Sequence, residues 1–152
     1  MGDEREFSRR RMMGLGGLAI AAAGIAGGWA LVRRDRFEGA TLTAPEALEA
    51  VRAGELLLVD IRRPDEWAST GIPEGAEPLD MRRDDFVEAL EALAGGTDRP
   101  VALICARGVR SDRMSAALEA AGFTTVADVS EGMLGSSAGP GWLARGLPVA
   151  RP

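Results

Sequence analysis

The sequence of 152 residues is 46% hydrophobic and 27% charged, which favours one globular domain over a disordered or fibrous chain. All 18 basic residues are arginine, and from Gly39 onward eleven arginines stand against eighteen acidic residues, a formal net charge of −7. This charge argues against nucleic-acid binding, while one cysteine and no histidine exclude an internal disulfide, the usual zinc-ligand sets and histidine-containing catalytic pairs.

The N-terminal part differs from the rest of the chain. Residues 12–32 carry no charge and are numerous enough for one helix across a bilayer. The stretch from Ser8 to Met13 (SRRRMM) resembles a twin-arginine export signal. We predict a cytoplasmic basic N-terminus (1–11), a hydrophobic membrane anchor or export signal (12–32), a linker (33–42) and a domain (43–150). The domain is expected on the periplasmic side of a bacterial inner membrane, anchored, or exported if the signal is cleaved. Because arginines flank both sides of the hydrophobic run, an anchor that leaves the domain in the cytoplasm is the alternative.

Strands and helices are expected to alternate along the domain. Thr43 and Glu46 can form a capping box, so a helix is expected to begin there and to end near Ala53. Apolar runs at residues 56–60 and 101–105 predict buried strands. The other expected elements are a helical turn at 64–68, a loop at 71–75, a short strand at 76–79, helices at 83–93 and 111–121, a strand at 124–129, and loops with short helix from 132 to 145.

This alternation predicts an α/β fold with a central parallel sheet flanked by helices, preceded by one N-terminal hydrophobic helix. In such sheets, ligands bind beyond the carboxyl ends of the strands. Cys105 lies at one of these ends, directly before a helix. Its position makes it the candidate nucleophile.

The loop after this strand can form an anion cradle. Its backbone N–H groups and the following helix N-terminus can point at one site, and the charges of Arg107 and Arg110 would favour a thiolate. Gly108 gives the loop conformational freedom, and Ser111 is a candidate helix N-cap that could also hydrogen-bond the sulfur. Two alternatives stay open: a buried structural cysteine and ordinary surface arginines. The predicted active loop consists of Cys105, Ala106, Arg107, Gly108, Val109, Arg110 and Ser111.

Four motifs in order make the region from Leu42 to Val149 resemble the rhodanese family. The Cys105 loop is similar to that family's Cys-x-x-Gly-x-Arg-Ser, although Ala106 stands where many members have arginine. The other similar segments are Asp60, Arg62, Glu66 and Trp67; Gly71-Ile72-Pro73 with Gly75-Ala76, lacking the usual histidine and with Glu74 inserted; and Trp142, Gly146, Leu147, Pro148 and Val149. The resemblance implies a rhodanese-like three-layer fold.

It also implies a reaction. The Cys105 thiolate would take the outer sulfur of a small anionic donor such as thiosulfate and carry it as a persulfide to a thiol acceptor, possibly a protein, or to cyanide. Arg110, and in one interpretation Arg107, would attract the donor. Asp60 and Arg62 would brace the loops at the strand ends, the alternative for Arg62 being a solvated turn. No metal and no organic cofactor are implied.

Two other functions remain possible. The first is a phosphatase or arsenate reductase, whose loops hold five residues between cysteine and arginine, whereas four lie between Cys105 and Arg110. The second is a non-catalytic rhodanese-like module that binds a partner or carries sulfur within a membrane complex.

Overall fold

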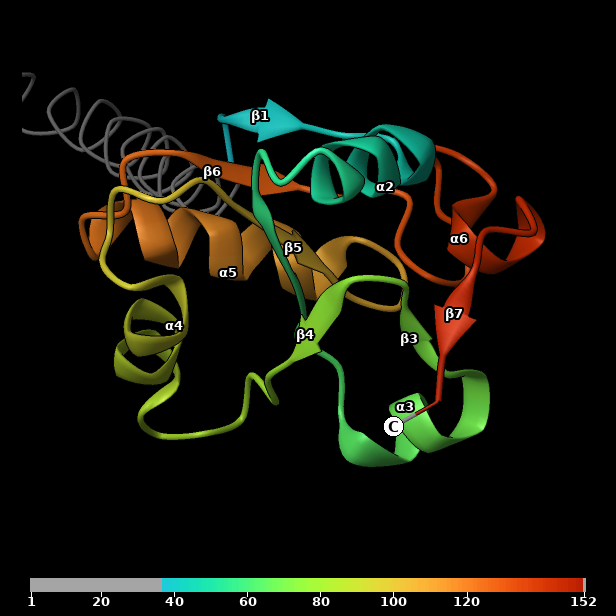
Figure 1. The fold of residues 1–152 in the computed structure, drawn as a ribbon, viewed down its shortest axis with the longest axis horizontal. Coiled ribbons are helices and arrows are strands. Elements are labelled where there is room, and N and C mark those ends of the chain that lie inside the picture. The colour runs from blue at the N-terminus through green and yellow to red at the C-terminus, as the bar shows by residue number, and fades with distance from the viewer. Residues whose placement is uncertain (1–36, 152) are drawn as a thin grey trace, which may run out of the picture. The chain divides into compact units, whose positions relative to one another are not determined.

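A five-stranded parallel sheet forms the centre of the chain (Figure 1). The computed structural model describes residues 37–151. The strands lie in the order β1-β6-β5-β2-β4, and every neighbouring pair is parallel. They are β1 (Ala40–Thr41), β2 (Leu57–Asp60), β4 (Ala76–Pro78), β5 (Val101–Ile104) and β6 (Val126–Asp128). A separate antiparallel pair joins β3 (Ile72–Pro73) to β7 (Val149–Ala150).

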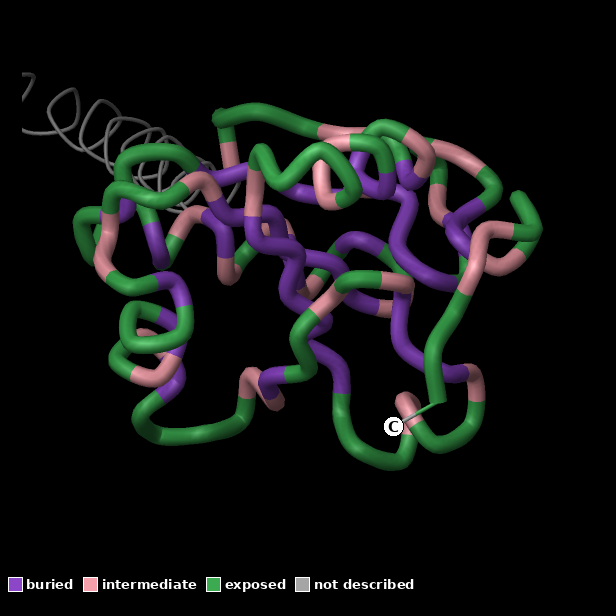
Figure 2. Tube along the Cα trace, in the orientation of Figure 1, coloured by how far each residue is buried: buried purple, intermediate pink, exposed green. Residues whose placement is uncertain are grey.

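Helices cover both faces of this sheet. They are α2 (Ala44–Arg52), α3 (Pro64–Thr70), α4 (Phe86–Ala94), α5 (Val109–Ala120) and α6 (Gly141–Ala144). Side chains of α4 and α5 form one buried apolar cluster with the sheet, and those of α2 and α6 form another. The central strands β2 and β5 are buried throughout, while exposed residues follow the outer helix faces and the turns (Figure 2). This is the predicted α/β class, with three layers.

The first helix begins as its local sequence predicts. The Thr43 N–H donates to Glu46 Oε2 at 2.7 Å, and the Glu46 N–H donates to Thr43 Oγ1 at 3.4 Å. This capping box satisfies two N–H groups that otherwise lack a partner in the helix. The buried strands β2 and β5 also form within the apolar runs that predict them.

Several element boundaries differ from the prediction because contacts distant in sequence decide them. The predicted linker (33–42) contains β1, which pairs with β6, and the Leu42 N–H donates to the Asp128 carbonyl at 2.9 Å. The predicted loop at 71–75 contains β3, because the C-terminal strand β7 pairs with it. The predicted single turn at 64–68 continues to Thr70 as α3.

Two helices start at other residues than predicted. The helix expected from residue 83 begins at Phe86, and Arg83 instead pairs with Asp85 at 2.7 Å in the turn before it. The helix expected from Ser111 begins at Val109 with Gly108 as its N-cap. The predicted capping role of Ser111 is therefore wrong, and its side chain is free to face the preceding loop.

The described residues contain no helix that is both long enough and apolar enough to cross a membrane. The predicted basic N-terminus (1–11) and hydrophobic anchor (12–32) lie outside the described residues. The membrane segment therefore stays a prediction.

A buried carboxylate ties α2 and α6 to the segment after β6. Glu131 is 1% exposed and accepts the Ala44 and Gly141 N–H groups at 3.3 and 2.9 Å. Arg145 supplies the opposite charge at 2.8 Å and lowers the pKa of Glu131. The carboxylate thus satisfies two helix N-termini and fixes the turn that follows β6.

A second buried ion pair holds the end of β2 against α3. Arg62 donates from Nε to Asp60 Oδ1 at 2.9 Å and from Nη2 to Oδ2 at 2.7 Å, and both side chains are almost fully buried. The same guanidinium donates to the Gly71 carbonyl at 2.7 Å and to Thr70 Oγ1 at 2.8 Å. Its burial excludes the solvated-turn alternative for Arg62. The pair therefore positions both ends of the segment that contains α3.

We expect Arg62→Met to lower the free energy of unfolding by about 3 kcal/mol, because the buried Asp60 carboxylate would lose its only charged partner among the described residues. Arg63→Met is the matched control, since Arg63 is 46% exposed and pairs at the surface, and its loss should change stability by less than about 0.5 kcal/mol. Urea unfolding of both variants measures the difference. Equal losses would contradict a structural role for the buried pair.

Candidate active site

Cys105 follows β5 directly and lies beneath the loop that leads into α5. It is 1% exposed, and its Sγ accepts the Gly108 backbone N–H at 3.2 Å. The buried Ser111 hydroxyl, one turn into α5, is 3.4 Å from the same sulfur and 3.2 Å from the Gly108 carbonyl. Because a hydroxyl has one proton to donate, a negative charge on the sulfur would draw it away from the carbonyl.

Glycine is required at two positions where backbone segments touch. Gly108 has a φ of 81°, and a Cβ there would collide with the Ser130 carbonyl oxygen. Gly132 has a φ of 65°, and its Cβ would lie 2.6 Å from the Ala106 carbonyl oxygen. The turn after β6 therefore presses against the cysteine loop, and this contact holds the Gly108 N–H on the sulfur.

Hydrogen bonds between the cysteine loop and the turn after β6 engage carbonyl groups of the loop but not the N–H groups at the start of α5. The carbonyls of Cys105 and Ala106 accept the N–H groups of Met133 and Leu134 at 2.9 and 2.8 Å. In the part of the chain that the structure describes, the N–H groups of Val109 and Arg110 have no protein acceptor, as at any helix start. The predicted anion cradle would consist of these groups and the Gly108 N–H.

Arg110 is brought to the site but is already paired. Its Nη1 and Nη2 donate to Glu66 Oε2 and Oε1 at 2.8 and 2.6 Å, a bidentate pair between α5 and α3. The hydrogen bonds from Arg110 lower the pKa of Glu66 to about 2. Glu66 in turn raises the pKa of Arg110, and Cys105 also raises it. The guanidinium therefore lies within electrostatic reach of the sulfur while its charge is balanced by Glu66.

The remaining loop residues lie at the rim. Arg107 donates from Nη1 to the Gly135 carbonyl at 3.4 Å, and Val109 is 61% exposed. Ala106 contributes its backbone to the contact with Gly132. The seven predicted residues thus span the end of β5, the loop and the first turn of α5, and hydrogen bonds to the Cys105 sulfur come from Gly108 and Ser111.

Two hollows flank α3. The α3–Leu134 hollow, of about 190 Å³, is lined by Arg62, Asp65, Glu66, Ser69, Thr70 and Leu134. Leu134 continues from the turn that binds the cysteine loop, so this hollow borders the site through Glu66 and Leu134.

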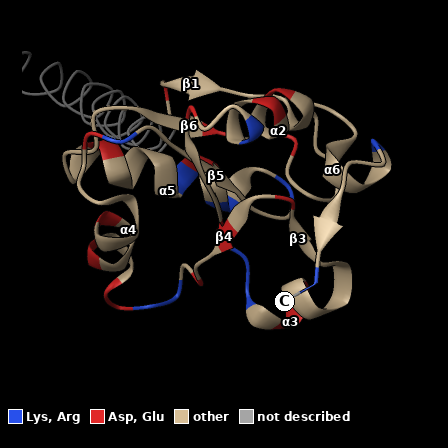
Figure 3. Cartoon of the chain, viewed as in Figure 1, with Lys and Arg blue, Asp and Glu red and all other residues tan. Residues whose placement is uncertain are grey.

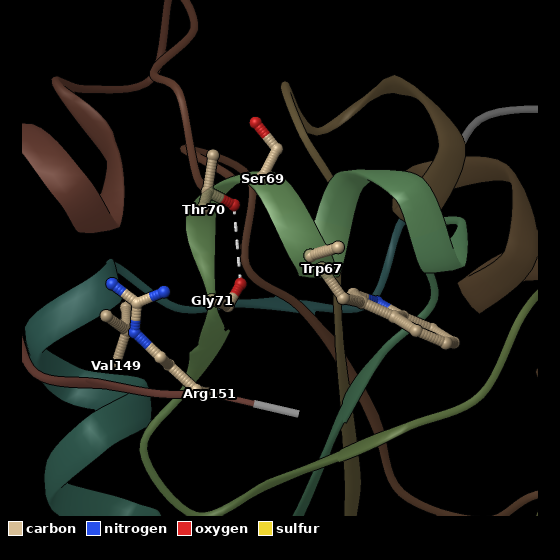
Figure 4. Close-up of a pocket in the computed structure, with 7 residues that line it drawn as sticks. Trp67, Ser69, Thr70, Gly71, Val149 and Arg151 are labelled. Carbon is tan, nitrogen blue, oxygen red and sulfur yellow. Dashed lines mark hydrogen bonds between the residues drawn. The ribbon is translucent and has the colours of Figure 1, made fainter.

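The second hollow, of about 320 Å³, lies between α3 and β7 (Figure 4). Trp67 and Arg151 stand on opposite sides of it, and Thr70 donates to the Gly71 carbonyl at 3.3 Å. It contains no residue of the cysteine loop and no carboxylate or thiol. We therefore assign it no part in the chemistry.

Charged groups do not form a metal site in residues 37–151, where no cluster of three or more cysteine, aspartate and glutamate side chains could hold an ion. Arginines and carboxylates are interspersed over the elements in Figure 3. The N-terminus of α5 adds a positive dipole beside Cys105.

A buried carboxyl that sequence reasoning missed lies beside the loop. Asp128, the last residue of β6, is 2% exposed, and its Oδ1 has no hydrogen-bond partner among the described residues. Burial raises the pKa of Asp128 to about 6, the Ser111 hydroxyl opposes this rise, and the charge of Asp112 adds to it. Ser111 thus acts on Asp128 as well as on the sulfur. A carboxylate at the end of an otherwise apolar strand is the signal that could have revealed it.

Residues 43–138 match the protein family described as Rhodanese-like domain. No curated protein sequence matches the chain. Among solved structures, the chain is similar to the 30 kDa polysulfide-sulfur transferase homodimer from Wolinella succinogenes, with 22% identity, a TM-score of 0.64, and coverage of 88% of this chain and 93% of that chain.

Two further solved structures are similar. Thiosulfate sulfurtransferase from Pseudomonas aeruginosa shares 25% identity and has a TM-score of 0.58, covering 74% of this chain and 20% of that chain. A protein of unknown function from Rhodopseudomonas palustris, described as a possible tyrosine phosphatase, shares 20% identity and has a TM-score of 0.55, covering 98% of this chain and all of that chain (100%). At these identities the likenesses mainly show a shared fold.

The raised pKa of Asp128 predicts a pH-dependent penalty on stability. The folded state keeps the Asp128 proton up to about pH 6, whereas the unfolded chain releases it near its ordinary value of 3.8, so stability falls as pH rises through this window. We expect Asp128→Asn to raise the free energy of unfolding by about 2 kcal/mol at neutral pH and by much less near pH 4. Urea unfolding at both pH values tests this.

The same substitution at the exposed Asp98 is the control for Asp128→Asn. A gain for Asp128→Asn that is equal at both pH values would rule out titration of Asp128 as its cause.

Proposed function

Because the chain belongs to the rhodanese-like domain family, we propose that it is a sulfurtransferase that carries sulfane sulfur as a persulfide on Cys105. The observation that carries this proposal is the pair of donors, the Gly108 N–H and the Ser111 hydroxyl, directed at the Cys105 sulfur. Neutral hydrogen-bond donors of this kind stabilise a negative charge on the sulfur. The similarity to a thiosulfate sulfurtransferase and to a polysulfide-sulfur transferase supports the reaction class.

In the first step, the Cys105 thiolate attacks the outer sulfur of the donor. A sulfur–sulfur bond forms to Cys105, and the bond between that sulfur and the rest of the donor breaks. With thiosulfate the leaving group is sulfite, which departs with the bonding electron pair. The N–H groups of Val109 and Arg110 have no protein acceptor among the described residues, so they are available to the anionic species formed at this stage.

In the second step, an acceptor thiolate attacks the outer sulfur of the Cys105 persulfide. The acceptor becomes a persulfide and Cys105 returns to its thiolate, so the two steps balance without an oxidant, a reductant or a cofactor. Cyanide can replace the thiol and leaves as thiocyanate. Because Cys105 is 1% exposed, the loop must open for an acceptor, which favours a protein thiol that docks over the loop.

That burial also favours a second candidate function, a rhodanese-like module that binds a partner or carries sulfur only within a complex. A phosphatase is less well supported, although one structural neighbour is described as a possible tyrosine phosphatase. Four residues separate Cys105 from Arg110, and the Arg110 guanidinium pairs with Glu66 instead of standing free for a phosphate.

The proposal includes a location at a bacterial inner membrane, with the domain on the periplasmic side. Its support is the uncharged run at residues 12–32 and the arginines before it. A membrane location would bring the domain close to a membrane-bound partner that supplies or receives sulfur.

A protein that consists of residues 37–152 should form thiocyanate from a sulfane donor and cyanide, and Cys105→Ser should abolish this activity, because the chain has no other thiol. Mass spectrometry of the donor-treated protein should show a gain of one sulfur atom that dithiothreitol removes. No persulfide from thiosulfate or from a polysulfide would refute the enzyme proposal. Phosphatase activity that depends on Cys105 would favour the other reaction class.

Ser111→Ala should lower the rate of persulfide formation about tenfold, because a hydrogen bond to a charged sulfur is lost. Ser115→Ala is a close control: Ser115 is buried one turn further along α5, and its hydroxyl has no partner among the described residues. That variant should keep its activity and its stability. Equal losses in the two variants would mean that the effect arises from packing rather than from the sulfur contact.

A further inference from the structure

The Arg110–Glu66 pair bears on which sulfur donors the site accepts. Both guanidinium nitrogens at the tip of Arg110 are engaged, at 2.8 and 2.6 Å, by the two carboxylate oxygens of Glu66. The pair is partly exposed, with 32% of the Arg110 side chain and 19% of the Glu66 side chain accessible. An incoming anion therefore meets a guanidinium whose bidentate face is already occupied.

The approach beside the pair is acidic. The α3–Leu134 hollow is lined by the carboxylates of Asp65 and Glu66, and its one arginine, Arg62, is buried against Asp60. Both carboxylates also pair with the exposed Arg63, at 2.9 and 3.4 Å, which neutralises part of this charge. The region from Gly39 onward also carries a net charge of −7. A donor with two negative charges loses more in this field than a donor with one.

We propose that Glu66 determines donor specificity at Cys105: by occupying Arg110, it disfavours donors with a dianionic head such as thiosulfate and favours low-charge sulfane donors, namely hydropersulfides. This inference rests on the proposed sulfur transfer. With a hydropersulfide, the Cys105 thiolate attacks the outer sulfur, the sulfur–sulfur bond of the donor breaks, and the donor leaves as a thiolate. The proton of the donor stays on the new persulfide or passes to solvent.

A second contact, besides that with Arg110, fixes the position of the Glu66 side chain. Its Oε2 also accepts the Arg63 N–H at 3.0 Å, at the start of α3. Glutamine can accept the same N–H, so Glu66→Gln preserves the helix start while it removes the charge. The low pKa of Glu66, about 2, means that the carboxylate stays charged at every pH used for an assay.

The first experiment measures charge at the site without sulfur transfer. Cys105 is the only cysteine, so its alkylation rates by anionic iodoacetate and by neutral iodoacetamide can be compared on the whole chain. The ratio of the two rates cancels loop opening and the thiolate fraction. We expect Glu66→Gln to raise the iodoacetate-to-iodoacetamide ratio about five- to tenfold at low ionic strength, and less at high salt.

Two further variants identify the cause of that rise. Asp65→Asn removes an equal charge, but Asp65 is 67% exposed and pairs with Arg63, so it should raise the ratio by at most about twofold. In the double variant Glu66→Gln/Arg110→Gln most of the gain should disappear, because the Arg110 guanidinium is gone. The Arg63 guanidinium, 3.4 Å from Glu66, is exposed and still pairs with Asp65. A ratio that Glu66→Gln leaves unchanged or lowers, or a gain that largely survives in the double variant, would overturn the proposal. Thermal unfolding of each variant verifies that it is folded.

The second experiment compares kcat/KM for thiosulfate and for cysteine persulfide. Glu66→Gln should raise the thiosulfate value relative to the persulfide value by about five- to tenfold, mainly through KM. An unchanged ratio of the two values would overturn the proposal. If the wild-type protein transfers sulfur from neither donor, the sulfurtransferase proposal fails, and the alkylation ratios still decide whether Glu66 masks Arg110.

Discussion

The hydrogen bond from the Gly108 N–H to the Cys105 sulfur requires an unusual backbone, and much of the site depends on it. Gly108 adopts a left-handed conformation directly before α5, so the chain turns sharply enough to bring this N–H back over the sulfur. The turn after β6 fills the space above Gly108, where a side chain would meet Ser130. The parallel pairing of β5 with β6 places both turns at the same edge of the sheet. The chemistry at Cys105 therefore depends on sheet register as well as on the loop itself.

A second series of contacts joins the buried core to the rim of the site. Asp60 at the end of β2 fixes Arg62, and Arg62 fixes the far end of α3 through the Thr70 hydroxyl and the Gly71 carbonyl. With α3 held in this way, Glu66 in its first turn meets Arg110 from α5. The buried Asp60–Arg62 pair thus positions the Glu66–Arg110 pair, which carries charge near the sulfur.

Features set by neighbouring residues are predictable from the sequence, and features set across the fold are not. The Thr43 capping box and the apolar strands β2 and β5 depend on local pattern, and the prediction of both is confirmed. The start of α5 is decided by the contact of Gly108 with Ser130, so local capping preference wrongly favoured Ser111. Glu66 and Arg110 lie 44 positions apart, and no local pattern in the sequence indicates that they pair. No periodicity reveals that the Asp128 carboxyl is buried beside Ser111.

The two kinds of positive group at the site differ in what they can stabilise. The Gly108 N–H, at the start of α5, is a fixed dipole directed at the sulfur, and it suits one negative charge of small size, such as a thiolate or a persulfide. A full cationic charge would be needed to hold a second negative charge on a bulky donor head, and Glu66 already balances the guanidinium of Arg110. Arg107, at the rim, contacts only the Gly135 carbonyl, at 3.4 Å. In the proposed sulfur transfer, local dipoles would stabilise the persulfide, while the field of a domain with an acidic net charge would disfavour highly charged donors. In the proposed function, the backbone N–H groups would serve the persulfide and the Glu66–Arg110 side chains would serve the choice of donor.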